Sequence, residues 1–179
     1  MTNVVRRSSA ELEPRQLASL RRLFEDAWPE EEGFTEDDWD HAFGGVHFLV
    51  EEDDRVVSHA SVVERELHVG PFPLVSGYVE AVATAPDRQG HGLGTAVMRA
   101  VGDHVDRSFE LGALGTDRFA FYGRLGWFVW AGPLAVRTAD GLRATPEENG
   151  FVLVRITPTS PPLDLTAPLS CEWRAGDVW

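Results

Sequence analysis

A glycine-rich turn between a long apolar strand and an amphipathic helix is the feature that most constrains the fold of this chain. The run "LVSGYVEAVATA" (74–85) is typical of a strand, and apolar residues recur with a helical period from Leu93 to Phe109. The turn between them, "DRQGHGLGTAVM" (87–98), carries three glycines in five positions. A short apolar strand, "LGALGT" (111–116), follows the helix. Strand, helix and strand in this order predict a βαβ crossover, and therefore an α/β fold.

The rest of the chain predicts antiparallel hairpins around that crossover. We expect one domain over residues 1–179, with residues 158–179 as a proline-rich tail. The expected architecture is a single mixed, mostly antiparallel twisted sheet of about seven strands flanked by about four helices. The other expected elements are a strand at Val4–Val5, a helix from Ser8–Ser9 to Trp28, a helix at Glu36–Phe43 capped by Thr35 and Asp38, a hairpin of 46–52 and 55–69 with Asp53–Asp54 as its turn, a helix in 117–126, and strands in 127–136 and 151–157.

The charge of the chain excludes several kinds of function. All 16 basic residues are arginine, because the chain has no lysine, and they face 29 acidic residues for a net charge of −13. Such a charge repels nucleic acid and anionic membranes and attracts cations. Net charge alone equally fits a protein that is acidic only for solubility. The absence of lysine excludes Schiff-base chemistry and a Walker-type phosphate loop.

Cysteine and histidine usage gives no sign of a metal site. The single cysteine, Cys171, excludes an internal disulfide framework, and we expect it to be a small buried residue. The six histidines show no ligand spacing, so we expect no metal. The N-terminal segment has no apolar signal-peptide core, and no apolar run approaches the ~20 residues of a membrane span. The sequence therefore predicts a cytoplasmic protein.

The glycine stretch fits neither a Walker-type loop, which needs a lysine, nor the dinucleotide-binding loop. A dinucleotide fingerprint needs a glycine where Thr95 stands and an acid about 20 residues further on, but Asp106 lies inside the predicted helix. What remains is a helix N-terminus whose free N–H groups suit a pyrophosphate, next to the guanidinium of Arg88. Taken alone, the stretch fits an ordinary glycine-rich turn as well.

The segment "QGHGLG" resembles the acetyl-CoA loop of the GCN5-related N-acetyltransferase (GNAT) superfamily, Gln/Arg-x-x-Gly-x-Gly/Ala, and the order of elements is similar over nearly the whole chain. The resemblance implies transfer of an acetyl group from acetyl-CoA to an amine. It implies that Val82, Ala83 and Thr84 pair with the pantetheine arm. The backbone N–H groups implied to hold the pyrophosphate of CoA are those of Gln89, Gly90, His91, Gly92, Leu93, Gly94 and Thr95.

The same resemblance, with the needs of acetyl transfer, gives three catalytic candidates. Glu80 lies two residues before Val82 and is expected to take the proton of the amine; the alternative is a solvated strand carboxylate. The N–H of Val82 is expected to polarise the thioester carbonyl. Tyr122, in "FAFYGRLGW", resembles the tyrosine that serves as the acid for the leaving thiolate; the alternative is core packing beside Phe119 and Phe121.

The segments "GFTEDDWDHAFGGVH" and "CEWRAGDVW" resemble the aminoglycoside 2'-N-acetyltransferase family. The resemblance implies a polycationic amino sugar as acceptor, direct transfer in a ternary complex, a role in antibiotic resistance, an acceptor site completed by the tail, and a homodimer. Several ammonium groups need several carboxylates. The implied acceptor ligands are Asp38, Glu80, Glu148, Asp177, the carboxylate of Trp179 and the carbonyl of Ala81.

Three departures from that family leave the acceptor open. Gly33, next to Glu32, replaces an aspartate, Gly115 replaces a serine, and the segment before Tyr122 is two residues shorter. One alternative is an acetyltransferase for another amine, such as a polyamine, another amino sugar or a peptide amine. Another is an acetyl-CoA-binding sensor without turnover, against which the presence of both Glu80 and Tyr122 argues.

Overall fold

The computed structural model describes residues 2–29 and 33–179, so Glu30, Glu31 and Glu32 of the acidic segment lie outside the described residues. The chain forms two compact units. Unit 1 consists of Met1–Val63 and Val79–Val101, and unit 2 of Glu64–Tyr78 and Gly102–Trp179. Two long strands and one helix run from one unit into the other.

The sheet of unit 1 is built from an antiparallel hairpin and the end of a long strand. Its strands are β1 (Val5–Ser8), β2 (Val46–Glu52), the first part of β3 (Arg55–Val69) and the last part of β4 (Phe72–Thr84). β2 pairs antiparallel with both β1 and β3. Asp53 and Asp54 join β2 to β3 with φ values of 49° and 61°, as a two-residue hairpin turn requires. The predicted hairpin is therefore confirmed.

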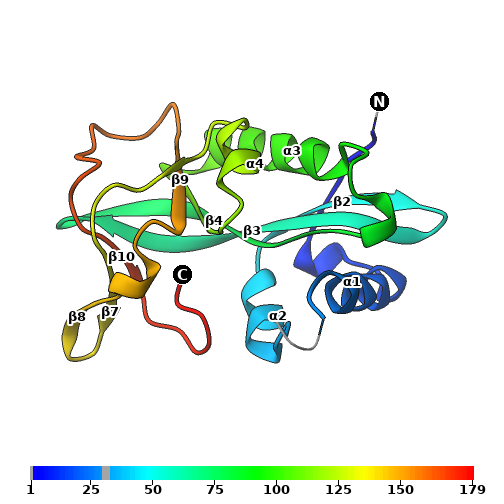
Figure 1. Ribbon diagram of the computed structural model, residues 1–179, viewed down its shortest axis with the longest axis horizontal. Helices are drawn as coiled ribbons and strands as arrows, with labels where there is room; N and C mark the ends of the chain where they lie inside the picture. Colours follow the sequence, from blue (N-terminus) through cyan, green and yellow to red (C-terminus); the bar gives the residue numbers. More distant parts are fainter. Residues whose placement is uncertain (1, 30–32) are drawn as a thin grey trace. The chain divides into compact units, whose positions relative to one another are not determined.

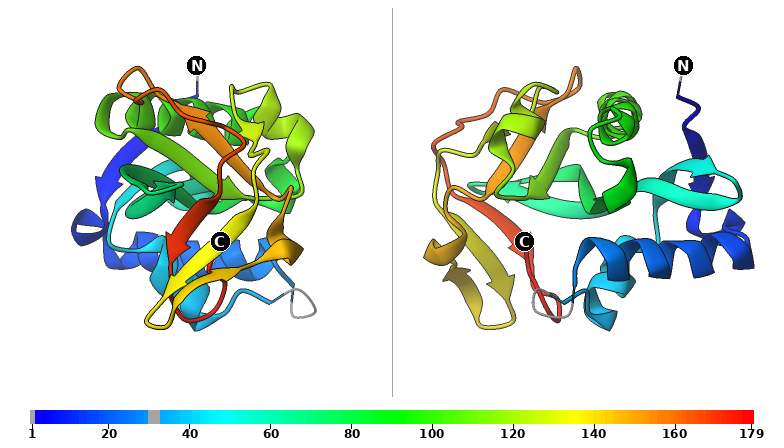
Figure 2. Two further views of the ribbon diagram at one scale, coloured as in Figure 1. Left: turned by 90° about the vertical axis from the view of Figure 1, so that its left-hand side faces the viewer. Right: turned by 45° about the vertical axis from the view of Figure 1, so that its right-hand side comes forward.

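Helices cover both faces of this sheet. α1 (Pro14–Ala27) and the first part of α3 (Leu93–Ser108) lie on opposite faces, as Figures 1 and 2 show, and the short α2 (Glu36–Ala42) follows α1. The predicted start of the first helix is wrong. Ser8 caps a single 3-10 turn, Ser9–Glu11, through a capping box with Glu11, and α1 begins only at Pro14, where the fixed φ of proline favours a first helical residue.

Unit 2 continues β3 and β4 into a larger mixed sheet. β4 pairs in parallel with β5 over Ser76–Tyr78, which confirms the predicted βαβ crossover through α3. On the other side, β10 pairs antiparallel with β3 and in parallel with β7, as the left view of Figure 2 shows for β10 and β7. The strands of this unit are β5 (Leu111–Gly115), β6 (Phe128–Val129), β7 (Leu134–Thr138), β8 (Gly141–Ala144), β9 (Val152–Ile156) and β10 (Leu169–Glu172), in the sheet order β6-β9-β5-β4-β3-β10-β7-β8.

The predicted α/β fold is confirmed, although the described chain has ten strands instead of about seven. The segment 127–136, expected as one strand, is two. β6 pairs with β9 and β7 pairs with β10, and Pro133 stands between them, where it cannot donate a ladder hydrogen bond. β8 and β10 were missed, because they are short and lie in turn-rich and proline-rich sequence. The fourth helix, α4 (Phe119–Gly123), is shorter than expected.

Two features of the described residues bear on the sequence predictions. Cys171 on β10 is completely buried, as expected, and its thiol lies 3.3 Å from the carbonyl oxygen of Val178. Within the described ranges, no helix has both the length and the apolar character needed to cross a bilayer.

Candidate active site

The glycine stretch forms an open loop at the N-terminus of α3. Gly90 and Gly92 have φ values of 78° and 80°, which a residue with a side chain rarely adopts, and the space where a Cβ would project is empty to 4 Å. In the part of the chain that the structure describes, the backbone N–H groups of residues 89–95 donate to no other group. A row of free N–H donors at the start of a 16-residue helix fits the pyrophosphate of CoA.

Side chains of the loop fix its shape. His91 donates from Nδ1 toward the carbonyl oxygens of Arg88 (3.2 Å) and Gln89 (3.0 Å), and Gln89 donates to the carbonyl of Thr84 at 3.3 Å. The guanidinium of Arg88 contacts Glu52 at 2.7 Å and Asp87 at 3.0 Å. Nε and Nη1 of Arg88 are therefore occupied by Glu52 and Asp87, whereas the backbone N–H groups of the loop remain open.

The predicted catalytic segment of β4 has an irregular backbone. The parallel pairing with β5 ends at Tyr78, and Glu80, Ala81 and Val82 follow, all partly exposed. Ala81 has a φ of 50°, and among the described residues it is the one non-glycine residue inside a strand with a positive φ. Its carbonyl oxygen, predicted to accept from the acceptor substrate, already accepts from Nδ1 of His59 at 2.7 Å. A carbonyl has two lone pairs, so one remains for a substrate.

Asp38, the other acidic residue predicted in unit 1, serves first as a helix cap. Its Oδ2 accepts from the N–H and the hydroxyl of Thr35 at 2.8 and 2.7 Å, while the Thr35 hydroxyl accepts from the Asp38 N–H at 3.2 Å. This confirms the predicted capping box at the start of α2. The other carboxylate oxygen of Asp38 is not part of the box.

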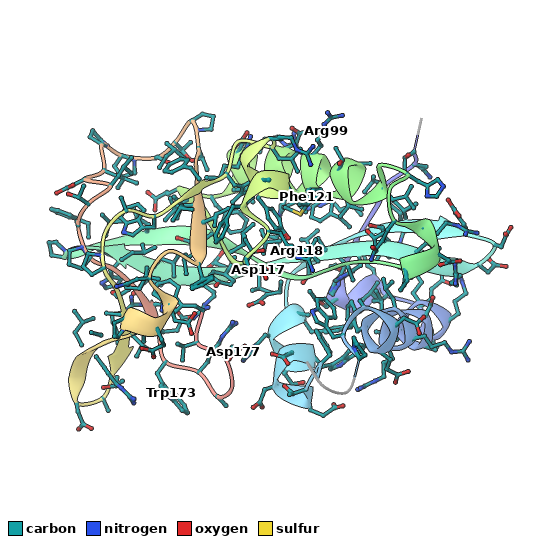
Figure 3. The ribbon with its side chains drawn as sticks, viewed as in Figure 1. Arg99, Asp117, Arg118, Phe121, Trp173 and Asp177 are labelled. Carbon is teal, nitrogen blue, oxygen red and sulfur yellow. The ribbon has the colours of Figure 1, made fainter. Side chains whose placement is uncertain are left out.

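Tyr122 lies on α4 in unit 2 and is 6% exposed. Burial raises the pKa of its phenol to about 12, with small opposing effects of Arg118 and Asp117. The hydroxyl makes no hydrogen bond within the described ranges. Figure 3 places Asp117, Arg118 and Phe121 on the segment that leads into and forms α4. The phenol of Tyr122 is thus protonated at neutral pH, and its ring contacts that of Phe121.

The C-terminal tail is anchored inside unit 2 by its last residue. Trp179 is 8% exposed, and its indole N–H donates to the hydroxyl of Thr145 at 3.0 Å. Its terminal carboxyl group lies beside β5, since a Cβ added to Gly115 would be 3.5 Å from the carboxyl carbon and 3.6 Å from the Tyr78 hydroxyl. Figure 3 shows Trp173 and Asp177 on the same tail. Trp179 is therefore held at a defined position in unit 2.

Glu148 stands three residues after the Thr145 that holds Trp179. Partial burial raises the pKa of its carboxyl group, and the negative charges of Asp177 and Glu147 raise it further. The structure thus brings together Glu148, Asp177 and the docked tail within unit 2. Carboxylates held close enough to repel each other favour a cation that neutralises them.

Two supporting contacts were missed at the sequence level. Thr145, which binds the indole of Trp179, lies in a turn-rich stretch that gave no signal. Ser58, His59 and Ser61 are completely buried on β3, and their carbonyl partners lie on β4. The polar residues inside the apolar run "VVSHASVV" are the signal that could have identified them, because a buried polar group needs a partner.

Comparison with known proteins identifies the family of this chain. The family described as "Acetyltransferase (GNAT) domain" matches residues 6–129. A GNAT family N-acetyltransferase of Escherichia coli in complex with CoA superposes with a TM-score of 0.67 at 14% identity, covering 96% of this chain and 91% of its own. A GNAT family acetyltransferase of Brucella melitensis in complex with acetyl-CoA gives 0.63 at 16% identity, with 98% of each chain covered. The chain belongs to the GNAT superfamily and is an acetyltransferase, with acetyl-CoA as the acetyl donor.

A relative with higher sequence identity identifies the family within the superfamily. The "Aminoglycoside 2'-N-acetyltransferase" of Mycolicibacterium fortuitum is 40% identical over 175 residues, which cover 96% of this chain and 89% of that protein. This chain and that enzyme are members of one family. The resemblance of the segments around Trp39 and at the C-terminus to the aminoglycoside 2'-N-acetyltransferase family is therefore confirmed.

Among the described residues, no group of three histidine, cysteine, aspartate or glutamate side chains is placed to hold a metal ion.

Proposed function

We propose that this acetyltransferase moves the acetyl group of acetyl-CoA to the 2'-amine of an aminoglycoside, by direct transfer in a ternary complex. The observation that carries the proposal is the 40% identity over 96% of the chain to an enzyme of that name. The carboxylates gathered around the docked tail support it, because an aminoglycoside carries several ammonium groups.

The donor site consists of backbone groups. The free N–H groups of Gln89, Gly90, His91, Gly92, Leu93, Gly94 and Thr95 bind the pyrophosphate, and the backbone of Val82, Ala83 and Thr84 pairs with the pantetheine arm. His91 contributes its backbone N–H, since its ring donates within the loop. Acetyl-CoA, when bound, supplies an activated thioester.

Three groups of the chain perform the transfer. Glu80 removes a proton from the acceptor ammonium, directly or through water, so that a neutral amine attacks. The N–H of Val82 donates to the oxygen that becomes negative. Tyr122 donates its phenolic hydrogen toward the departing sulfur, and the raised pKa keeps that hydrogen in place at neutral pH.

The proposed ligands of the acceptor are Asp38, Glu80, the carbonyl of Ala81, Glu148, Asp177 and the carboxylate of Trp179. We propose that residues 1–179 act as one catalytic domain, with 158–179 as the tail that completes the acceptor site.

The proposed substrates indicate where the enzyme acts. We propose that the enzyme is cytoplasmic, because acetyl-CoA is made in the cytoplasm, and that it has a role in antibiotic resistance. We propose a homodimer formed through the late strands and tail, on which Leu142 and Trp173 are each 63% exposed. Sedimentation of the purified protein tests the dimer, and the minimal inhibitory concentration in an expressing host tests resistance.

One assay tests the reaction. Release of CoA thiol from acetyl-CoA is followed with two aminoglycosides that are matched except for a 2'-amine in one and a 2'-hydroxyl in the other. We expect turnover with the amine alone. Equal turnover of both refutes the 2' position, turnover of a polyamine alone identifies a different acetyltransferase, and CoA binding without turnover of any amine identifies a sensor.

A further inference from the structure

A continuous row of hydrogen bonds runs through the buried part of unit 1 to the carbonyl of Ala81. The hydroxyl of Ser9 lies 2.8 Å from Nε2 of His47, and Nδ1 of His47 lies 2.9 Å from Nε2 of His59. Nδ1 of His59 lies 2.7 Å from the Ala81 carbonyl oxygen. At the far end, the N–H of Gly44 donates to the Ser9 hydroxyl at 3.0 Å. We call this row, which runs from Ser9 through His47 and His59 to Ala81, the histidine relay.

The chemistry of its two ends fixes the direction of every hydrogen bond. A carbonyl only accepts, so His59 carries its proton on Nδ1 and donates to Ala81. A neutral His59 then accepts at Nε2, so His47 donates from Nδ1 and accepts from Ser9 at Nε2. Ser9 in turn accepts from the backbone N–H of Gly44. With both rings neutral, the relay therefore has one consistent arrangement: each ring nitrogen has a partner, and the Ser9 hydroxyl donates to His47 at 2.8 Å and not to the Gly45 carbonyl at 3.3 Å.

The surroundings of the relay keep both rings neutral. Both histidines are completely buried, and their rings contact each other and the rings of Phe43 and Phe24. Burial lowers the pKa of His47 to about 4 and that of His59 to about 3. Neither ring therefore takes up a proton in the physiological range.

The relay ends where β4 departs from regular geometry. Ala81 has a φ of 50°, a conformation disfavoured for a residue with a Cβ, so neighbouring contacts must hold it. Two further side chains of β3 support the same segment: Ser61 donates to the carbonyl of Glu80 at 3.4 Å, and Ser58 donates to that of Ala83 at 3.2 Å. Side chains thus fix the carbonyl groups on either side of the Val82 N–H.

We propose that His59, oriented by His47, is a positioning residue for acetyl transfer: by donating to Ala81 it holds the left-handed turn that aims the Glu80 carboxylate and the Val82 N–H. This inference rests on the proposed roles of Glu80 and Val82. A pair of histidines filling space would need no fixed proton positions, whereas the relay has one possible set. His59 acts through the backbone and touches neither substrate.

Two variants of His59 separate positioning from packing. In His59→Asn the amide nitrogen takes the place of Nδ1 and can still donate to Ala81. In His59→Gln the longer side chain reaches the place of Nε2, next to His47, and lacks a donor at Nδ1. We expect kcat to fall about tenfold in His59→Gln, the effect of one lost buried hydrogen bond, and to recover in His59→Asn. The Kd of CoA, measured by calorimetry, should change less than threefold in both, because residues 89–95 supply its donors.

Nuclear magnetic resonance of the wild-type protein without ligand tests the relay independently of turnover. We expect imidazole nitrogen shifts that report a proton on Nδ1 and none on Nε2 for both histidines. We also expect the Ala81 carbonyl carbon and Val82 amide nitrogen shifts to move in His59→Gln and to return in His59→Asn. A proton on Nε2 of His59, or a cationic ring at neutral pH, overturns the relay even if a variant fails to fold.

The outcomes separate this inference from the proposed function. Expected shifts in a protein that acetylates no amine refute the proposed function, and with it the catalytic role of the relay, while the geometry of the relay stands. An active wild-type enzyme whose kcat is unchanged in His59→Gln refutes the positioning role alone. An equal loss of kcat in both variants would mean that His59 acts only through packing, and this result also overturns the positioning role.

Discussion

Removal of Trp179 is the most direct test of the docked tail. The side chain is 8% exposed, and its indole donates to the Thr145 hydroxyl at 3.0 Å. Burying an aromatic ring of this kind removes about 150–250 Å² from water, which at about 25 cal/mol per Å² stabilises docking by roughly 4–6 kcal/mol. The hydrogen bond adds about 1 kcal/mol. Deleting the residue should therefore release the end of the tail.

Two further changes separate the contribution of the indole hydrogen bond from that of the terminal carboxylate. Trp179→Phe keeps a buried ring and the carboxylate but leaves the Thr145 hydroxyl, itself 6% exposed, without its partner. The unpaired hydroxyl costs about 1–3 kcal/mol, so burial of the ring still stabilises docking by roughly 1 kcal/mol or more. A C-terminal amide, introduced by peptide ligation, keeps the indole and removes only the charge.

The assay is kcat/KM for a 2'-amino aminoglycoside at saturating acetyl-CoA, with the Kd of CoA measured beside it. We expect kcat/KM to fall at least about 100-fold on deletion and about threefold in Trp179→Phe. The amide should lower it by about 10- to 100-fold, the worth of one charge-assisted hydrogen bond. The Kd of CoA should stay the same in all three, since its phosphate donors lie in residues 89–95.

Two results would refute this reasoning. An amide as active as the free acid would show that the terminal carboxylate does not bind the acceptor. A deletion variant with unchanged kcat/KM would show that docking of the tail has no part in the reaction.

Three further predictions concern single residues. Tyr122→Phe should lower kcat by about 10²–10⁴-fold, and by the same factor at pH 7 and pH 9, because a phenol whose pKa is about 12 is protonated at both. The KM for the aminoglycoside should rise as pH falls through the raised pKa of Glu148, since the charged form binds the cation; Glu148→Gln should remove that part of the pH profile. Gly33 has a φ of 52°, which aspartate tolerates, so Gly33→Asp should lower this KM severalfold while the control Gly33→Ala should not.

The parts predicted from sequence are those in which local chemistry decides the structure. The glycine spacing from Gly90 to Gly94 identified an open helix N-terminus, because free N–H groups depend on backbone conformation. Asp53–Asp54 and the Thr35 capping box were predicted for the same reason. Each feature lies within a few residues, and the structure confirms the turn, the cap and the βαβ crossover.

The parts that escaped prediction depend on contacts between distant segments. β8 and β10 are four residues each and are stabilised by pairing with β7, so their own sequence carries little signal. The left-handed turn at Ala81 is held by His59, which lies 22 positions earlier. The pairing of Arg88 with Glu52, which lies 36 positions away, carries no signal in the local sequence.

The proposed donor and acceptor sites therefore differ in how far sequence identity predicts them. The proposed donor site consists of backbone groups, which depend on the fold, and structures only 14–16% identical share that fold. The proposed acceptor site consists of side chains from separate segments, so single replacements matter even at 40% identity. Gly115 is such a position: a Cβ there would lie at ordinary contact distance, 3.5 Å, from the Trp179 carboxyl group. The Cβ of a serine would fit there without displacing the tail, so we expect the replacement by glycine to act on the hydrogen bonding of the carboxylate and not on its position.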